Sequence, residues 1–192
     1  LKDDTFRVPM FAGCLTGAAL FCYISSASAV FMGQYGLSQQ QFSYAFAFNA
    51  AGIMLMSSIN KHLNTRMGIF QRLRLGGSIQ CFGALAVFGT GLMADAPLWL
   101  LMSGLFFVVS GIGLTGPNAM ALAMSQQGAR AGTASAIMGS MQFACGLLGG
   151  VILNFLVWKA SLNMGIMMVL FTSAGLFAIL KVGKQLKHSI SA

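Results

Sequence analysis

Residues 113–150 read GLTGPNAMALAMSQQGARAGTASAIMGSMQFACGLLGG, and this stretch decides what kind of fold to expect. Two apolar segments meet at a short polar turn whose only charge is Arg130. The first segment carries Pro117 within its apolar pattern, and the second is rich in small residues around one amide, Gln142. Apolar segments of this length with almost no charge are typical of helices that cross a lipid bilayer.

The composition of the whole chain also indicates that it lies in a lipid bilayer. Of its 192 residues, 57% are hydrophobic and 7% are charged, whereas a soluble domain has roughly 25% charged residues. So little charge cannot cover a surface that faces water, and a membrane is therefore expected. The net charge of +8 does not indicate a nucleic-acid partner, because the basic residues lie between apolar segments rather than together on one face.

Six apolar segments are long enough to cross a hydrocarbon core of about 30 Å as helices. Backbone polar groups in lipid must be satisfied within their own segment, which favours helices over open strands. We therefore predict an all-α membrane protein, a bundle of six transmembrane helices that forms a single domain over residues 1–192. The expected spans are residues 8–32, 42–59, 75–93, 98–124, 134–158 and 164–180.

The basic residues predict the orientation of these spans. If the chain crosses the membrane six times, one side holds Lys2, Arg7, Lys61, Arg66, Arg72, Arg74, Arg130, Lys181, Lys184 and Lys187, and the other side holds only Lys159. Loops rich in Lys and Arg stay in the cytoplasm. Both termini are therefore expected to be cytoplasmic, and an even number of spans also requires that the two termini share a side.

The expected spans contain no Asp, Glu, Lys or Arg. A proton-driven transporter usually keeps an ionisable group at membrane depth, so these segments by themselves offer no proton carrier. The four cysteines lie in apolar segments without a Cys-x-x-Cys pair or a nearby histidine, which indicates buried thiols. We find no Ser–His–Asp set, phosphate loop or metal-ligand spacing, and we expect no enzyme activity, no metal and no cofactor.

Polar and aromatic side chains recur at helical spacing in the first two spans. Tyr23 and Ser26 lie on one face of the first span, and Phe46 and Asn49 lie on one face of the second. An aromatic wall with a few polar groups suits a cavity for lipophilic ligands. Helix–helix packing with local hydrogen bonds explains the same pattern, and the sequence leaves both interpretations open for Tyr23 and Asn49.

The fourth span is expected to bend at Pro117, which crowds the backbone carbonyl of Gly113 and removes one backbone donor. Asn118 or Thr115 could supply a partner for that carbonyl. The bend is either a hinge that lines a pathway or a static kink, and the sequence does not decide between them.

The fifth span carries a stripe of small residues that permits close and sliding helix contacts. The stripe consists of Ser135, Gly139, Gln142, Gly146 and Gly150. Gln142 is expected to face protein or water, because an unpaired amide in lipid is costly.

Several of these motifs resemble one family, the Bcr/CflA (bicyclomycin/chloramphenicol resistance) drug transporters of the major facilitator superfamily. Residues 21–26 (FCYISS) resemble part of its seventh transmembrane helix, and residues 42–49 (FSYAFAFN) with Asn60 and residues 63–68 (LNTRMG) resemble its eighth helix and exit. Residues 117–121 (PNAMA) resemble the tenth helix, and residues 131–135 (AGTAS) with Gly139, Gln142 and Phe143 resemble the eleventh. The resemblance covers nearly all of this chain but only the second half of a family member.

The resemblance implies one half of a twelve-helix major facilitator fold in a bacterial inner membrane. It implies an antiporter that exports small hydrophobic drugs by alternating access in exchange for protons. The implied partners are membrane lipid, a drug-like substrate, protons and the N-terminal six-helix half, where the carboxylates that handle protons mainly lie. The first, second, fourth and fifth spans would then line a central cavity, and the third and sixth would face lipid. The expected substrate-binding residues are Tyr23, Ser26, Phe46, Asn49, Asn118 and Gln142.

Two other functions remain open at this point. One is a major facilitator transporter of another small solute, such as a sugar or an amino acid. The other is a six-span membrane protein that binds or scaffolds without transport, as a homodimer for example. The chain begins with Leu1 rather than Met, and we expect it to be a fragment of a longer protein.

Overall fold

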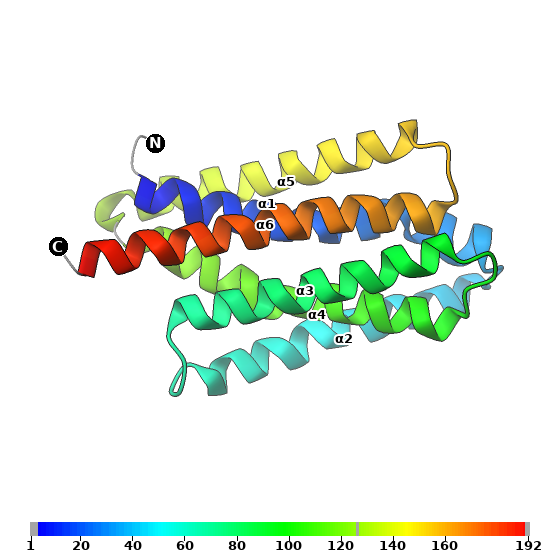
Figure 1. Ribbon diagram of the computed structural model, residues 1–192, viewed down its shortest axis with the longest axis horizontal. Helices are drawn as coiled ribbons and strands as arrows, with labels where there is room; N and C mark the ends of the chain where they lie inside the picture. Colours follow the sequence, from blue (N-terminus) through cyan, green and yellow to red (C-terminus); the bar gives the residue numbers. More distant parts are fainter. Residues whose placement is uncertain (1–3, 126, 191–192) are drawn as a thin grey trace.

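The computed structural model describes residues 4–125 and 127–190, with the side chains of all of these except 4, 5, 7, 129, 154 and 182–190. All regular structure in these ranges is helical, which confirms the predicted all-α class (Figure 1). The long helices are α1 (Asp4–Ser28), α2 (Gln39–Leu63), α3 (Ile69–Leu92), α4 (Leu98–Met124), α5 (Ala131–Phe155) and α6 (Ala160–Ile190). A π-helix, η1 (Ala29–Gln34), continues α1, and a 3₁₀ turn, η2 (Gly128–Arg130), precedes α5.

Each of the six long helices is long and apolar enough to cross a membrane, as the fold prediction requires. Several helices extend beyond the predicted spans. Arg72 and Arg74, which the sequence assigned to a loop, lie in the second turn of α3, because that helix already begins at Ile69. Lys2 and the side chains of Arg7, Lys184 and Lys187, which entered the orientation prediction, lie outside the described part of the chain.

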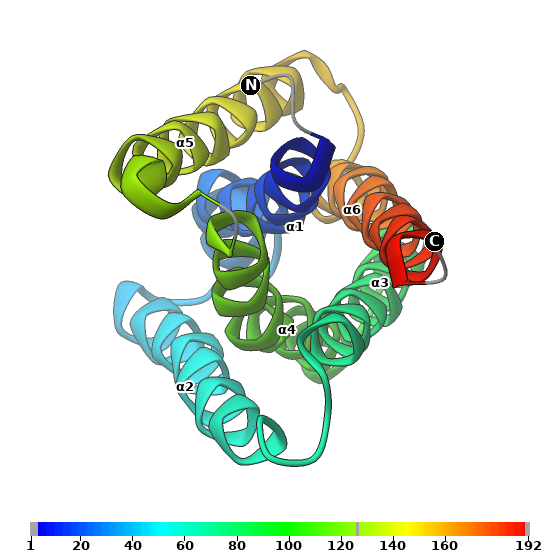
Figure 2. The ribbon, with the colours of Figure 1, turned by 90° about the vertical axis from the view of Figure 1, so that its left-hand side faces the viewer.

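Four helices form a ring, and two helices are attached to its outside. Within the ring, α1 packs against α4 and α6, and α3 packs against the same two helices. Outside it, α2 packs against α4 and α5 packs against α1 (Figure 2). The main contacts are unchanged when α1, α2 and α3 are exchanged for α4, α5 and α6. The bundle is therefore built from two three-helix repeats, an arrangement common in membrane transport folds.

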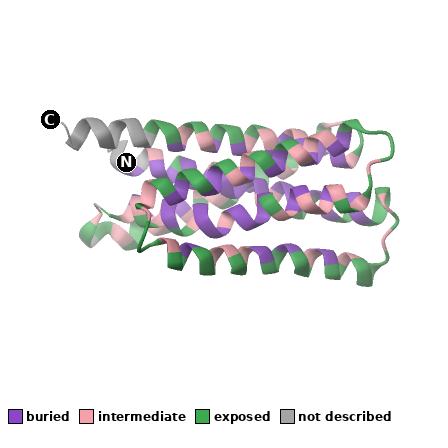
Figure 3. Cartoon of the chain, turned by 60° about the horizontal axis from the view of Figure 1, so that its bottom comes forward, coloured by how far each residue is buried: buried purple, intermediate pink, exposed green. Residues whose placement is uncertain are grey.

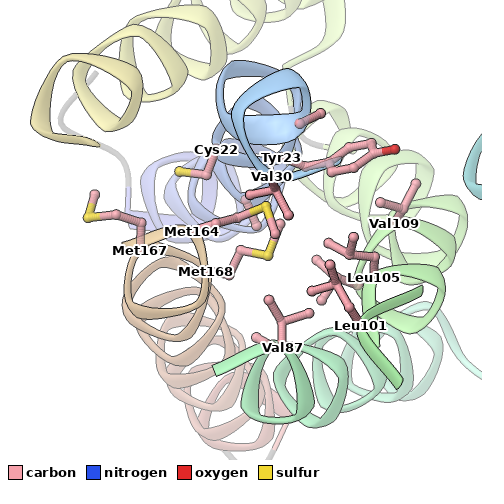
Figure 4. Packing of buried hydrophobic residues seen from close by; sticks show 14 of the residues in the cluster. Cys22, Tyr23, Val30, Val87, Leu101, Leu105, Val109, Met164, Met167 and Met168 are labelled. Carbon is pink, nitrogen blue, oxygen red and sulfur yellow. The ribbon is translucent and has the colours of Figure 1, made fainter. Parts of the chain in front are cut away.

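Burial differs sharply between the ring and the attached helices. Within the most apolar window of each helix, 61% of residues are buried in α1 and 56% in α4, against 11% in α2 and 17% in α5. Buried residues gather at the centre of the bundle and exposed ones on its outside (Figure 3). The central side chains come from all four ring helices and include Val30, Val87, Leu101, Leu105, Met164 and Met168 (Figure 4).

The start of α2 is fixed by a reciprocal cap. The backbone N–H of Gln41 donates to the Ser38 hydroxyl over 3.3 Å, and the backbone N–H of Ser38 donates to Gln41 Oε1 over 2.9 Å. This capping box satisfies two backbone donors that a helix start leaves unpaired. It also sets where the residues of α2 that follow it lie against the ring.

Glycines allow α3 and α4 to approach closely. A Cβ on Gly83 would lie 2.7 Å from the carbonyl oxygen of Gly104 and 2.7 Å from the backbone nitrogen of Val108. Two turns earlier, a Cβ on Gly76 would lie 3.1 Å from the carbonyl oxygen of Gly111. A Cβ on Gly83 would press on the backbone of α4, and a Cβ on Gly76 would press on the Cβ of Leu114 and the backbone of Gly111. These atoms cannot move aside as the end of a flexible side chain can. Small residues at such crossings are the usual means of close helix packing in membranes.

We therefore predict that Gly83→Ala destabilises the protein, because overpacking of a tight contact costs about 1–3 kcal/mol. Gly89→Ala is the matched control on the same helix, since a Cβ there meets no atom within 4 Å. The measurement is the apparent unfolding temperature of the purified protein in detergent. We expect a clear decrease for Gly83→Ala and no decrease for Gly89→Ala, and equal behaviour of the two variants would contradict the packing argument.

Candidate functional site

Three of the predicted site residues, Tyr23, Phe46 and Asn49, come together where α1 faces α2. Asn49 Nδ2 donates a hydrogen bond to the Tyr23 hydroxyl oxygen over 3.0 Å. The rings of Tyr23 and Phe46 are stacked, with centroids 5.2 Å apart and planes inclined by 18°. Phe31 and Phe42 extend this aromatic cluster, with Phe42 in ring contact with both Phe31 and Phe46. The aromatic wall with a polar handle is therefore present.

The members of this cluster differ in how far they can be reached. Tyr23 is 1% exposed and Asn49 is 0% exposed, whereas Phe46 is only partly buried. Phe46 and Phe42 are therefore the partly exposed members, and Tyr23 and Asn49 lie behind them between packed helices. Asn49 Oδ1 is buried and has no hydrogen-bond partner among the described residues. Such an unpaired acceptor costs about 1–3 kcal/mol and often marks a polar group with a role beyond packing.

Ser26 lies elsewhere, on the wall of a cavity of about 770 Å³ between α1, α5 and the start of α6. Its hydroxyl donates to the carbonyl oxygen of Cys22 over 2.8 Å, one turn earlier in the same helix. The serine is therefore satisfied within α1, as the packing interpretation expects, and its oxygen still has acceptor capacity toward the cavity.

Gln142 is partly buried and lies against α1, where its amide occupies the space that a side chain on Gly17 would fill. Further along the predicted stripe, Gly146 faces Phe21 and Gly150 faces Ser25. The small residues of α5 thus form its contact with α1. Gly139 is different, because a Cβ there meets no atom within 4 Å.

Asn118 is 3% exposed and belongs to a polar network between the C-terminal parts of α2 and α4 and the N-terminal part of α3. Its Nδ2 donates to Asn60 Oδ1 over 2.8 Å and to the carbonyl oxygen of Leu114 over 2.7 Å. Asn118 thus donates to the carbonyl oxygen of Leu114, and not to that of Gly113 as we expected from the sequence. In this conformation the side chain is engaged within the protein.

The centre of this network is Arg72, which sequence reasoning treated only as a loop charge. Its Nη1 donates to Asn60 Oδ1 over 3.1 Å, and its Nη2 donates to Asn64 Oδ1 over 2.7 Å. The residue is 8% exposed, and its Nε has no hydrogen-bond partner in the part of the chain that the structure describes. The spacing of Asn60 and Asn64, one turn apart before a basic segment, is the signal that could have indicated this network.

A second missed residue, Gln80, lies at the middle of the bundle and is 0% exposed. Its Nε2 donates to the carbonyl oxygens of Thr16 in α1 and Val108 in α4, each over 3.3 Å. The amide therefore links three ring helices. No sequence pattern distinguished it, because a single amide in an apolar helix gives no spacing to read.

Comparison with known proteins gives consistent results. Residues 2–150 match the family model of the Major Facilitator Superfamily. The chain is 32% identical over 141 residues to the Bicyclomycin resistance protein homolog of Haemophilus influenzae, which covers 73% of this chain and 35% of that protein. It is 33% identical over 153 residues to the Uncharacterized MFS-type transporter YdgK of Bacillus subtilis, which covers 79% of this chain and 37% of that protein. Each match spans little more than a third of the relative's length.

We predict that Asn60→Ala is much more destabilising than Asn64→Ala. Asn60 is buried and accepts from both Arg72 and Asn118, so its loss leaves buried donors unpaired at about 1–3 kcal/mol each. Asn64 is exposed and accepts only from Arg72 in the described part of the chain. Unfolding temperatures of the two variants test this, and equal decreases would show that the network does not depend on Asn60.

Proposed function

The chain belongs to the major facilitator superfamily, and from that premise we propose that it is the C-terminal six-helix half of a proton-coupled transporter that exports small hydrophobic drugs. The observation that carries the proposal is the aromatic cluster of Tyr23 and Phe46 on a six-helix membrane bundle of this family. In the proposal the protein moves its substrate unchanged and is not an enzyme.

An uncharged substrate fits the chemistry of the spans. None of the predicted spans contains an Asp, Glu, Lys or Arg that would pair with a charged solute. The aromatic cluster presents stacked and tilted rings with one amide and one phenol behind them. Mostly apolar sites with a few polar groups are typical for small drug-like molecules. The name of the Haemophilus influenzae relative, which refers to bicyclomycin resistance, supports a drug as the substrate.

A second half is part of the proposal because the relatives are much longer than the matched region. The attached helices α2 and α5 lie on one side of the bundle, with α1 and α4 between them (Figure 2). In the proposal this side faces the other half across a central cavity, and α3 and α6 face lipid. The same missing half would supply the ionisable group that carries protons. Transport would proceed by rocking of the two halves around a midplane site.

We assign two kinds of role to the predicted site residues. We propose that three of these residues touch the substrate. Ser26 lines the cavity, and the side chains of Phe46 and Gln142 are only partly buried. Tyr23, Asn49 and Asn118 are proposed as positioning residues in this conformation. Tyr23 and Asn49 support the ring of Phe46 from behind, and Asn118 holds α4 next to Pro117 against α2.

We predict that Phe46→Ala in the complete protein lowers drug export about tenfold, because it removes a partly buried ring that stacks on Tyr23 at the surface of the cluster. Tyr23→Phe is expected to lower export a few-fold, since it removes only the hydroxyl that Asn49 holds. Phe48→Ala is the matched control, because Phe48 is 52% exposed and pairs instead with Phe106 of α4. The measurement is dye uptake into inverted membrane vesicles, in which export from the cytoplasmic face loads the vesicle lumen, with and without a proton gradient.

The outcomes of this assay separate the alternatives. Uptake that does not respond to the proton gradient would contradict proton coupling. Transport of a sugar or amino acid without drug export would favour another major facilitator transporter. Equal activity of the Phe46 and Phe48 variants would contradict the assigned binding surface.

The proposed orientation places both termini in the cytoplasm of a bacterium, at its inner membrane. In a variant without native cysteines, Thr65→Cys lies in the turn after α2 and Ala94→Cys lies in the turn after α3, and both positions are exposed. We predict that a membrane-impermeant maleimide applied to intact spheroplasts labels Ala94→Cys but not Thr65→Cys, because basic segments are retained inside. Labelling in the opposite pattern would invert the proposed topology.

A further inference from the structure

The cavity of about 770 Å³ that contains Ser26 has features of a ligand site in its own right. It lies at the end of the bundle where α5 connects to α6, opposite the turn between α2 and α3 (Figure 1). The contact of α5 with α1 at this level is made by Gly146 against Phe21 and by Gly150 against Ser25. Because these glycines contribute no side chains, space remains beside the contact. Its volume falls within the range of about 300–1,000 Å³ that is usual for small-molecule sites.

Aromatic rings form the walls of this cavity. Phe21 of α1 and Phe143 of α5 pair edge to face, with centroids 5.2 Å apart and planes inclined by 63°. Trp158, in the connection between α5 and α6, adds a third ring. Phe143 is 67% exposed and Trp158 is 57% exposed, so neither ring is covered by the rest of this chain. Rings in such positions offer faces and edges to a flat aromatic molecule.

The backbone of Trp158 is hydrogen-bonded by the side chain of Asn163, which also lines the cavity. Asn163 Nδ2 donates to the carbonyl oxygens of Leu156 and Trp158, over 2.9 Å and 3.1 Å. The amide thus bridges two backbone carbonyls of the connection that follows α5. The backbone that carries the third ring is therefore fixed by hydrogen bonds.

The polar groups of the cavity are neutral. Ser25, Ser26 and Asn163 are its polar side chains, and none of the described side chains that line it is charged. The neighbouring Lys159 is directed elsewhere, because its Nζ donates to the carbonyl oxygen of Ala94 over 3.0 Å. A site of this kind gives no counter-ion to a charged ligand, whereas the serine oxygens can accept a hydrogen bond from an N–H or O–H group.

We propose that this cavity binds an uncharged, flat aromatic molecule that carries a hydrogen-bond donor, at a site separate from the Tyr23–Phe46–Asn49 cluster. The ligand lies between the rings of Phe21, Phe143 and Trp158 and directs its donor toward Ser25 and Ser26. The inference rests on the proposed function in one respect, that Ser26 contacts the transported substrate. Binding itself requires no transport and is measured separately.

The test uses N-phenyl-1-naphthylamine, an uncharged aromatic amine that absorbs where tryptophan emits. The complete protein in lipid vesicles is titrated with the probe, and energy transfer from tryptophan is recorded against protein-free vesicles. We expect saturable transfer that falls strongly in Trp158→Phe. Trp99→Phe is the matched control, because Trp99 is 70% exposed, lies just after the connection between α3 and α4, and does not line the cavity. Equal transfer in the two variants would overturn the proposal.

A second pair of variants measures affinity without changing tryptophan. Phe143→Ala removes one wall and is expected to raise the dissociation constant of the probe about tenfold. Phe155→Ala is its control on the same helix, since Phe155 is 79% exposed and lies outside the cavity lining. Both side chains are largely exposed, so unfolding temperatures are expected to stay close to that of the parent protein. Equal affinities of the two variants, or a probe signal no larger than in protein-free vesicles, would exclude the site.

Proton-driven drug export, measured on the same variants, distinguishes this inference from the proposed function. Saturable probe binding that depends on Trp158 and Phe143, without any drug export, would retain the site and refute the transporter. Drug export together with probe binding that ignores both residues would retain the transporter and refute the site.

Discussion

The requirement that backbone polar groups be paired inside lipid is the constraint from which the rest of this structure follows. An unpaired N–H or C=O in hydrocarbon costs several kcal/mol, so each crossing segment must form its own helical hydrogen bonds. The six helices meet this requirement, and their apolar side chains then face lipid and one another with little difference in free energy. What remains to be decided is how the helices pack, and small residues and a few amides decide it.

The amides act at three levels of the bundle. Gln80 ties α3 to α1 and α4 at the centre, Asn49 ties α2 to α1 through Tyr23, and Asn60 ties α2 to α3 and α4. Each hydrogen bond joins two different helices, and those of Gln80 with Thr16 and of Asn118 with Asn60 join helices that are not consecutive in the chain. Since lipid offers these side chains no partner, every one of them favours a single arrangement of its neighbours. A few polar groups can therefore specify a bundle whose apolar surfaces alone would not.

The two three-helix repeats share a layout but differ in how their outer helices are attached. α2 is joined to the ring by hydrogen bonds of the Asn49 and Asn60 side chains in addition to close contacts at Gly52 and Gly113. α5 runs along α1 through glycines such as Gly146 and Gly150. Contacts between small residues are smooth and leave room beside them. The cavity between α1, α5 and α6 lies beside the contacts of Gly146 and Gly150. The two sites proposed above lie at these two contacts, one where α1 faces α2 and one where α1 faces α5.

The amino-acid sequence by itself determined that the chain is helical, that it has six membrane-crossing segments, and which family it resembles. These properties depend on segment length, hydropathy and local motifs, all of which can be read along the chain. It also placed Tyr23, Phe46 and Asn49 on suitable faces, although it left open whether those faces pack together or line a cavity. Only the tertiary structure showed that Asn49 bonds Tyr23, that Asn118 bonds Asn60, and that Arg72 lies inside a helix and a buried network. The reason is that lipid is as apolar as the protein core, so the periodicity of an apolar helix does not tell which face meets a neighbour, and only the packed bundle fixes the rotation of each helix and the partner of each amide.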